Sequence, residues 1–290
     1  MPPTLTIAVF GRGALPAGVV RGVQASAHTL VQLGPHRMRW WQSDPVAAAA
    51  PGVPRGRLAD ARGADLWLTA DCPHLLSAAE LAVPRFGVLN VHWSLLPRHR
   101  GPTPATATLL AGDRTAGVTV HRATPEVDGG AIVGQWSFDV GPRDTAVALY
   151  TRAARRIEAE LPALLDRVAA DPECGTPQDP DAVTTHRRPT LADTRLDWAS
   201  PAAELDRRIR AFTYPLAWTT WRGRRVWVSA ATPVEGAGEP GQVLGAGPVV
   251  AAGEGALRLD RAWLGGLPWL WWPHTGERLG SDPRRAVGGG

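Results

Sequence analysis

The sequence contains no lysine, and all 31 of its basic side chains are arginines. It has only two cysteines, Cys72 and Cys174, which lie far apart and have no cysteine neighbour. This spacing excludes a CxxC-type zinc site and gives no basis for a disulfide framework. No apolar stretch approaches the roughly 18 uncharged residues that a membrane-spanning helix needs. The sequence therefore predicts a water-soluble protein with neither a metal site nor a membrane partner.

The first residues, MPPTLTIAVFGRGALP, lack the basic segment that precedes the apolar core of a signal peptide. They predict a first strand, and the cytoplasm is the expected compartment. The net charge is +4, because 31 arginines face 27 acidic residues. The uniform use of arginine, with abundant alanine, glycine and proline, indicates a GC-rich genome rather than a binding function. A surplus of this size permits a phosphate or RNA ligand without requiring one, and no DNA partner is expected.

Strand-like and helix-like segments alternate through the first 170 residues. The predicted strands are residues 6–10, 28–33, 65–70, 87–92, 116–124 and 131–140. The predicted helices are residues 15–27, 76–83, 103–111 and 145–170, the last with a kink at Pro162. This alternation is typical of an α/β domain with a Rossmann-like, mostly parallel sheet and helices on both faces. We expect this domain to span residues 1–185.

The composition of the sequence and its pattern of predicted elements change after residue 170. Residues 171–189, DPECGTPQDPDAVTTHRRP, are rich in proline, aspartate and threonine and are the best linker in the chain. A helix at 200–212 and a series of short strands separated by glycine-rich turns predict a small β-barrel domain over residues 190–265. The predicted strands are residues 218–221, 225–230, 249–251 and 256–263. Residues 266–290 form a tail, in which Trp269, Trp271 and Trp272 indicate no particular role.

Three polar side chains stand in an otherwise apolar, glycine- and proline-rich stretch, residues 87–133. Asn90 and His92 close the strand predicted at 87–92, and Asp128 follows in a later loop. Side chains at i and i+2 of a strand point the same way, so Asn90 and His92 project together. The carboxyl end of a strand is where open α/β sheets bind their ligands. An amide donor beside an imidazole is suited to stabilising an oxyanion and moving a proton.

The same stretch contains an ordered set of short motifs. They are Asn90-x-His92, Ser94-Leu95-Leu96-Pro97, Arg100-Gly101, Pro104, Gly117-Val118-Thr119-Val120-His121 and Val127-Asp128-Gly129-Gly130. Their order and spacing resemble the folate-dependent formyltransferase family. In that family an asparagine, a histidine and an aspartate form the catalytic trio, so the resemblance implies that Asn90, His92 and Asp128 are catalytic. Asp128 alone could instead be a turn residue, since Asp-Gly favours turns.

The resemblance implies 10-formyltetrahydrofolate as the formyl donor, without a metal or a covalent intermediate. Its pterin ring would bind against Leu75-Leu76 and Leu95-Leu96-Pro97, with Asp128 beside it, although these apolar residues could also simply fill the core. Gly11-Arg12-Gly13 lacks both the third glycine of GxGxxG and an acidic residue about twenty positions later. We therefore assign Gly11, Arg12 and Gly13 to the acceptor substrate rather than to a dinucleotide.

Three other polar residues of the stretch have less specific signals. Arg100 either orients an anionic substrate or holds the loop at 93–104 by bonding carbonyl groups, and the sequence favours neither role. Ser94 is expected to cap a turn, because no base accompanies it as it would a nucleophile. His121 lies on a predicted strand and is expected to be structural.

Short motifs in the C-terminal half resemble the second domain of methionyl-tRNA formyltransferases and sugar formyltransferases, which is OB-like. They are Leu196-Asp197-Trp198, Arg208-Ile209-Arg210-Ala211, Tyr214-Pro215 and Trp218-Thr219. The resemblance leaves four acceptors open: a small-molecule or carrier-bound amine, the methionyl group of initiator tRNA, glycinamide ribonucleotide, and water in a formyltetrahydrofolate hydrolase. Glycinamide ribonucleotide enzymes usually lack a second domain, and the hydrolases join other domains that this chain does not have.

The tRNA-acting branch carries a basic insertion in its first domain. In this chain Gln42-Ser43-Asp44-Pro45 leads into VAAAAPGVP without such an insertion. Arg222, Arg224 and Arg225 cluster in a predicted hairpin and could contact phosphates, but a charge cluster is usually a solvated face. The sequence thus favours transfer to a small-molecule or carrier-bound amine, with tRNA as the alternative.

Overall fold

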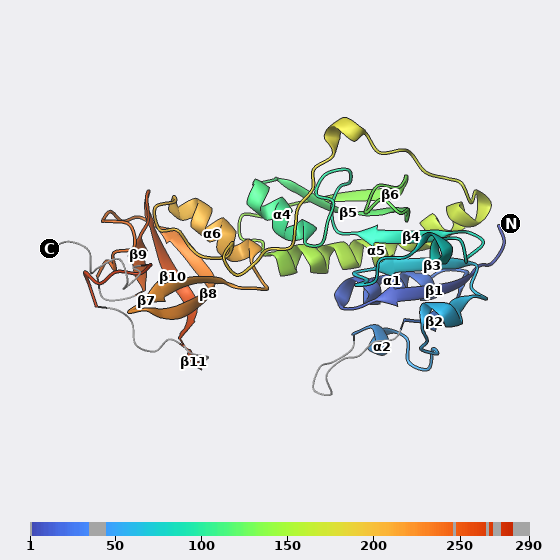
Figure 1. Ribbon diagram of the computed structural model, residues 1–290, viewed down its shortest axis with the longest axis horizontal. Helices are drawn as coiled ribbons and strands as arrows, with labels where there is room; N and C mark the ends of the chain where they lie inside the picture. Colours follow the sequence, from blue (N-terminus) through green and yellow to red (C-terminus); the bar gives the residue numbers. More distant parts are fainter. Residues whose placement is uncertain (1, 35–44, 246–247, 265–266, 269–273, 281–290) are drawn as a thin grey trace. The chain divides into compact units, whose positions relative to one another are not determined.

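The computed structural model describes residues 2–34, 45–245, 248–264, 267–268 and 274–280. The chain divides into two compact units (Figure 1). Unit 1 comprises Met1–Thr108, Arg114–Gly141 and Val147–Arg187, and unit 2 comprises Leu109–Asp113, Pro142–Ala146 and Arg188–Gly290. Trp269, Trp271 and Trp272 of the tail lie outside the described residues. In the described part of the chain, no helix combines the length and the apolar character needed to cross a membrane.

Unit 1 is built on a six-stranded sheet of order β2-β1-β3-β4-β5-β6. Its strands are β1 (Thr6–Gly11), β2 (Thr29–Leu33), β3 (Leu66–Ala70), β4 (Val88–His92), β5 (Thr115–Arg122) and β6 (Ile132–Asp139). The pairs β1–β2, β1–β3 and β3–β4 are parallel, whereas β5 runs antiparallel to both β4 and β6. The predicted mostly parallel sheet is therefore confirmed, with one reversed strand beside the strand that carries Asn90 and His92.

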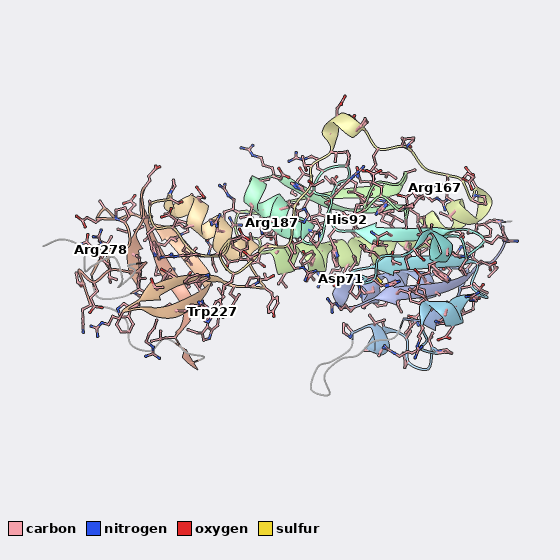
Figure 2. The ribbon with its side chains drawn as sticks, viewed as in Figure 1. Asp71, His92, Arg167, Arg187, Trp227 and Arg278 are labelled. Atoms are coloured by element: carbon pink, nitrogen blue, oxygen red, sulfur yellow. The ribbon has the colours of Figure 1, made fainter. Side chains whose placement is uncertain are left out.

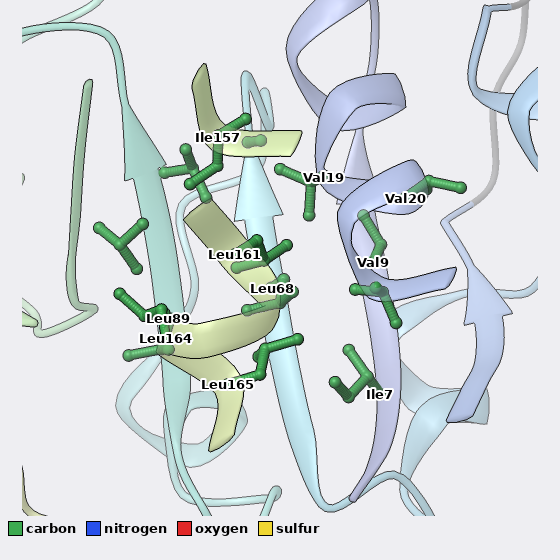
Figure 3. Close-up of a cluster of buried hydrophobic side chains, with 14 of the residues drawn as sticks. Ile7, Val9, Val19, Val20, Leu68, Leu89, Ile157, Leu161, Leu164 and Leu165 are labelled. Carbon is green, nitrogen blue, oxygen red and sulfur yellow. The ribbon is translucent and has the colours of Figure 1, made fainter. Parts of the chain in front are cut away.

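Helices cover both faces of this sheet, as predicted. The helices between residues 2 and 170 are α1 (Ala14–Gln24), α2 (Pro45–Ala49), the 3-10 helix η1 (Leu58–Ala61), α3 (Ala78–Leu81), α4 (Pro104–Ala111) and α5 (Ala146–Ala170), and residues of α1, α2 and α5 on one face and of η1 and α3 on the other pack against the sheet. Leu161 and Leu165 of α5 pack with Val19 of α1 against Val9 and Leu68 of the sheet (Figure 3). Burial of each such side chain stabilises the fold by about 1.5–3 kcal/mol. Pro162 lies inside α5, which continues as a helix on both sides of it.

The opposite face of the sheet carries a smaller core, in which Phe10, Trp67 and Val88 pack with residues of η1 and α3. Val88 on this face and Leu89 on the other show the period-2 alternation of β4 directly. Asn90 and His92 consequently belong to the same face as Val88. This is the shared projection that the sequence predicted.

Local chemistry explains where two predicted helices differ from the observed ones. The helix expected at 76–83 is a single turn, because Ser77 and Glu80 close a capping box at its start and Pro84 follows shortly after its end. The helix expected at 15–27 ends at Gln24, where Ser26 bonds the carbonyl oxygen of Val23 through both its N–H and its hydroxyl group.

Residues 171–187 of the segment predicted as the best linker, 171–189, are bonded into unit 1. Thr176 exchanges two backbone hydrogen bonds with Ile132, at 2.8 and 2.9 Å, and η2 (Pro180–Ala182) follows. Proline and aspartate disfavour a regular helix or strand here, but they leave enough backbone groups to pair with unit 1. The linker prediction was wrong for this part of the segment.

Unit 2 contains α6 (Ala202–Ala211) and a curled antiparallel sheet. Its strands are β7 (Ala217–Trp221), β8 (Arg224–Val234), β9 (Val249–Ala251), β10 (Ala256–Leu264) and β11 (Leu267–Pro268). The order is β11-β10-β8-β7, with β9 also paired to β10. Leu205 and Ile209 of α6 share a core with Val226, Val228 and Leu257 of the sheet. This half-barrel agrees with the small OB-like domain expected in the C-terminal half.

Candidate active site

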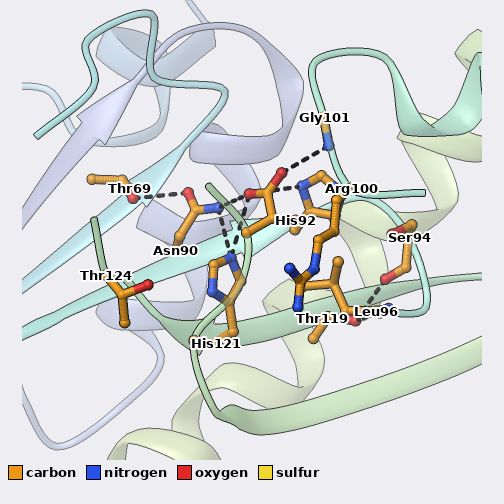
Figure 4. Close-up of polar contacts among 12 residues, drawn as sticks. Thr69, Asn90, His92, Ser94, Leu96, Arg100, Gly101, Thr119, His121 and Thr124 are labelled. Carbon is orange, nitrogen blue, oxygen red and sulfur yellow. Dashed lines mark hydrogen bonds and ion pairs between the residues drawn. The ribbon is translucent and has the colours of Figure 1, made fainter. Parts of the chain in front are cut away.

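A row of three polar side chains crosses the sheet of unit 1 near the carboxyl end of β4. The strand register places Thr69 of β3 opposite Asn90 of β4, and Asn90 opposite His121 of β5. Side chains in directly opposite positions lie about 4.5–5.5 Å apart at Cβ, so the three can bond to one another. Thr69 and His121 are buried, with 4% and 2% of their surface exposed. We call Thr69, Asn90 and His121 the polar row (Figure 4).

The polar row fixes which way the Asn90 amide points. The Thr69 hydroxyl donates to Asn90 Oδ1 at 2.8 Å, and Asn90 Nδ2 lies 3.0 Å from His121 Nε2. His121 Nδ1 lies 2.9 Å from the Arg122 carbonyl oxygen, which can only accept, so the imidazole proton is on Nδ1. Nε2 therefore accepts one hydrogen of the amide. The other points to Asp128 Oδ1 at 3.4 Å, a long contact that leaves it available to a ligand.

His92 is buried at the end of β4, with 5% of its surface exposed. Its Nε2 lies 3.0 Å from the carbonyl oxygen of His99 and donates to it, and its Nδ1 lies 3.5 Å from Asp128 Oδ1. Burial lowers the pKa of His92, and the charge of Asp128 offsets this only in part. The imidazole is thus neutral at rest, with one nitrogen facing a carboxylate that favours its protonation.

Asp128 approaches the histidines from the loop between β5 and β6. Its φ is 54°, a left-handed conformation that aspartate tolerates better than most residues. Its Oδ2 accepts the backbone N–H of Gly101 at 2.9 Å, and its Oδ1 lies 3.6 Å from His121 Nε2. Burial acts to raise the pKa of Asp128, but the imidazoles of His121 and His92 and the Gly101 N–H outweigh it and leave the pKa at about 2. Asp128 is therefore a carboxylate at neutral pH.

The loop after β4 has its own supports. The Ser94 hydroxyl donates to the Arg98 carbonyl oxygen at 2.7 Å, which is the expected turn cap. Arg100 is buried and pairs through Nη1 with Glu126 at 2.5 Å and through Nε and Nη2 with Gln178 at 3.2 and 2.9 Å. These contacts favour the loop-holding role of Arg100 over an anion-binding one.

Gly101 and Gly11 are glycines for steric reasons. A Cβ at Gly101 would lie 2.4 Å from the carbonyl oxygen of His186, and φ there is 120°. A Cβ at Gly11 would lie 1.7 Å from the carbonyl oxygen of Ala70, at φ 149°. Each position thus admits only glycine, and Gly11 lets the end of β1 approach the end of β3.

The residues predicted to bind folate or acceptor lie after the carboxyl ends of three neighbouring strands. Gly11 ends β1 and Arg12 and Gly13 follow it, Leu75 and Leu76 follow β3, and Leu95, Leu96 and Pro97 follow β4. Leu75 is 76% exposed, whereas Leu96 is 3% exposed and belongs to the interior. Adjacent strands lie about 4.8 Å apart, so the Gly11–Gly13 loop is roughly 10 Å along the sheet edge from β4.

The structure brings Asn90, His92 and Asp128 together, as the sequence predicted. It adds Thr69 and His121, which sequence reasoning had left aside or taken as structural. It also adds two residues of the supposed linker, Gln178 and His186. Polar residues at strand positions opposite Asn90 were the available signal for the first two. No group of three His, Cys, Asp or Glu side chains among the described residues is arranged to hold a metal ion.

Two family models match this chain. The formyl transferase model matches residues 55–165, and the formyl transferase C-terminal domain model matches residues 190–266. The first of these ranges includes β3, β4, β5 and all three predicted catalytic residues.

Curated relatives and solved structures agree with these matches. Methionyl-tRNA formyltransferase from Methylococcus capsulatus is 38% identical over 200 residues, which are 67% of this chain and 65% of that protein, just under two thirds of its length. The same enzyme from Chloroflexus aggregans is 34% identical over 226 residues, 73% of each chain. An N-formyltransferase from Helicobacter canadensis, crystallised with folinic acid and dTDP-3-aminofucose, has the same fold, with a TM-score of 0.68 at 16% identity over 88% of this chain and 98% of that one. This chain belongs to the formyltransferase family.

Proposed function

We propose that the protein transfers a formyl group from 10-formyltetrahydrofolate to an amine. The observation that carries this proposal is the cluster of Asn90, His92 and Asp128, in which an oriented amide, a buried imidazole and an ionised carboxylate converge at the carboxyl end of β4. The Helicobacter canadensis enzyme of the same fold was crystallised with folinic acid, which supports a folate donor here.

In the proposed reaction an unprotonated amine attacks the formyl carbon. The new C–N bond forms as negative charge builds on the formyl oxygen, and the bond from that carbon to the folate nitrogen then breaks. The Asn90 N–H that makes only a 3.4 Å contact with Asp128 is the donor to this oxyanion. One such donor contributes on the order of 3 kcal/mol to transition-state stabilisation.

The proton released by the amine must reach the folate nitrogen that departs. Asp128 is ionised and can accept this proton directly or through water. His92 Nδ1, 3.5 Å from the same carboxylate, is the position at which the proton is held before it passes to the leaving nitrogen. No covalent intermediate is required, because amine, formyl carbon and leaving nitrogen react in one direct transfer.

The apolar loops beside the cluster suit the pterin ring of the donor. Leu75 exposes 76% of its surface after β3, and the Leu95–Pro97 turn follows the neighbouring strand β4. The buried Leu96 would shape this turn from within rather than touch the ring. An exposed leucine beside a polar cluster is the expected composition of a small-molecule site, with apolar walls and a few oriented polar groups.

For the acceptor we propose a small-molecule or carrier-bound amine, bound toward the Gly11-Arg12-Gly13 loop. The sequence after Gln42 lacks a basic insertion. In unit 2, Arg222 is paired with Glu277 at 2.6 Å, and Arg225 is stacked on Trp218 and Trp227. Two cations of the predicted arginine cluster therefore already have partners within unit 2.

Initiator methionyl-tRNA is the second candidate acceptor. The two curated relatives described above carry that name. In unit 2, Arg195 and Arg225 stack on Trp218, and Arg225 also stacks on Trp227, with guanidinium-to-ring distances of 4.6–5.6 Å. We call these four residues the Arg–Trp ladder. Guanidinium groups and indole faces of this kind can bind phosphates and bases.

Release of tetrahydrofolate from 10-formyltetrahydrofolate tests both steps of the proposal. We expect release by the purified protein to depend on added amine, and a panel of amino sugars, amino acids and methionyl-tRNA then ranks the acceptors. Release at full rate without any amine would establish a hydrolase instead. Efficient use of methionyl-tRNA with none of the small amines accepted would replace the first acceptor by the second.

A further inference from the structure

Residues 176–186, which we call the clasp, border the catalytic cluster although they follow α5 in the chain. At one end Thr176 pairs with Ile132, at the start of β6. At the other end the Arg100 N–H donates to the Thr184 carbonyl oxygen at 2.9 Å, and the His186 N–H donates to the Arg100 carbonyl oxygen at 3.0 Å. The clasp thus bonds to the loop after β4, and its first residue pairs beside the loop that carries Asp128.

Gln178 is the third residue of the clasp and joins these two loops through one amide group. Its Nε2 donates to the carbonyl oxygens of Asp128 and Gly130, at 2.7 and 2.8 Å. Its Oε1 accepts from Nε and Nη2 of Arg100. Both amide hydrogens and the amide oxygen are therefore used, and every partner belongs to a loop that touches the catalytic cluster.

The bonds of Gln178 fall where the Asp128 loop needs support. Asp128 has a left-handed backbone, with φ 54°, which a non-glycine residue retains only when its surroundings hold it. The Asp128 carboxylate accepts the Gly101 N–H, while Gln178 holds the Asp128 carbonyl oxygen on the other side of the same residue. Removal of the Gln178 donations would free this backbone to turn and to carry the carboxylate away from His92.

We infer that Gln178 is a positioning residue for the reaction, whose amide holds the Asp128 carboxylate at His92 by bonding the carbonyl groups of residues 128 and 130. The inference rests on the proposed formyl transfer for its catalytic consequence. Gln178 touches no reacting atom in this arrangement and acts through Asp128 alone. The acceptor half of its amide, which bonds Arg100, is not what positions Asp128.

Two substitutions separate the halves of the amide. Gln178→Glu keeps an oxygen that accepts from Arg100 and loses both N–H donations. Gln178→Met, a side chain of similar size, loses the donors and the acceptor together. We expect kcat to fall tenfold or more in both variants, with the KM for the folate donor within threefold of wild type. Gln32→Met is the matched control, because Gln32 Nε2 also donates to a backbone carbonyl oxygen, that of Arg57, away from the cluster. A Gln178→Glu variant with the kcat of wild type would overturn the inference.

A second measurement does not depend on which reaction the protein performs. The His92 ring interacts with Asp128, His121, His99 and His186, and the Asp128 carboxylate and the His99 carbonyl oxygen favour its protonated form. NMR titration of His92 in the full-length chain should give a lower pKa in Gln178→Met than in wild type, and an unchanged value in Gln32→Met. If wild type releases no tetrahydrofolate with any amine, the proposed function fails while this shift still supports the positioning role. Equal titration in all three proteins would contradict that role, whatever the activity.

Discussion

The proposed catalytic cluster of unit 1, which is Asn90, His92 and Asp128, and the Arg–Trp ladder of unit 2 both gather polar and charged side chains on a sheet, but only the first is largely withdrawn from solvent. His92 and His121 are 5% and 2% exposed, and each ring nitrogen of theirs has a partner at a defined distance. In the ladder, Arg195 and Arg225 are exposed and lie over indole rings. His92 lies in unit 1 and Trp227 in unit 2 (Figure 2).

Burial decides how much each arrangement can do. In the protein interior a hydrogen bond or a charge acts in a low dielectric, and the neighbouring groups fix its geometry. Removal of one polar group therefore changes the strength and geometry of the hydrogen bonds made by its neighbours. At the surface, water and salt screen the same interactions, and an exposed ion pair or cation–π contact contributes about 0–1 kcal/mol. We therefore expect the largest functional effects in unit 1 and small ones in the ladder.

Removal of the predicted catalytic side chains should break the cluster most completely. Asn90→Ala, His92→Ala and Asp128→Ala should each lower kcat about a hundredfold or more, because each removes an interaction made mainly in the transition state. Steady-state kinetics, with circular dichroism to establish folding, is the measurement. Near-normal turnover in a folded His92→Ala variant would remove His92 from the mechanism.

Loss of the hydrogen bond that orients the Asn90 amide should lower kcat by a smaller factor, and this effect is specific to the polar row. His121→Phe removes the acceptor that holds Asn90 Nδ2, so the amide can turn its oxygen toward the oxyanion. We expect kcat to fall about tenfold, since one oriented donor is weakened rather than removed. His28→Phe is the control, because His28 is also buried in unit 1 and bonds the Leu5 N–H away from the site. An equal loss in both variants would reduce His121 to a packing residue.

The sequence could predict the first part of this network but not the second. Alternation within β4 placed Asn90 and His92 on one face, because side-chain direction in a strand is a local property. His121 joins them through the antiparallel register of β4 and β5, which sets Asn90 opposite His121 and depends on the whole sheet. Gln178 was hidden in a proline-rich segment, whose composition excludes a regular helix but does not say which surface the chain crosses.

His186 extends the comparison to pH, because burial shifts its pKa away from the value of an exposed histidine. Its Nε2 accepts the Thr103 N–H at 2.8 Å, and burial, followed by the charges of His92 and His99, lowers its pKa from 6.5 to about 4. A folded pKa below the unfolded one means that stability is full above about pH 6.5 and falls as the pH approaches 4.

His186→Gln should therefore flatten the pH dependence of the free energy of unfolding between pH 6.5 and 4. His186 is partly buried, so after allowance for screening we expect a difference of about 1–2 kcal/mol between wild type and variant across this range. Urea unfolding at a series of pH values measures it. The contribution of Asp128 lies lower, between pH 3.8 and about 2, and does not overlap. Parallel curves for the two proteins would contradict this assignment.

The smallest effect is expected where the charges are most exposed. The triple change of Arg222, Arg224 and Arg225 to Ser removes the Arg222–Glu277 pair and the stacking of Arg225 on Trp218 and Trp227. These surface contacts together should contribute about 1 kcal/mol to the free energy of unfolding.

With a small amine as acceptor, the kcat and KM of the triple variant should stay at the wild-type values and change little between low and high salt. If methionyl-tRNA were the acceptor, its binding would fall steeply with salt, and the triple change would make that dependence shallower. Titration of activity against salt in both proteins thus decides whether unit 2 takes part in acceptor binding through these arginines or carries them only as a solvated surface.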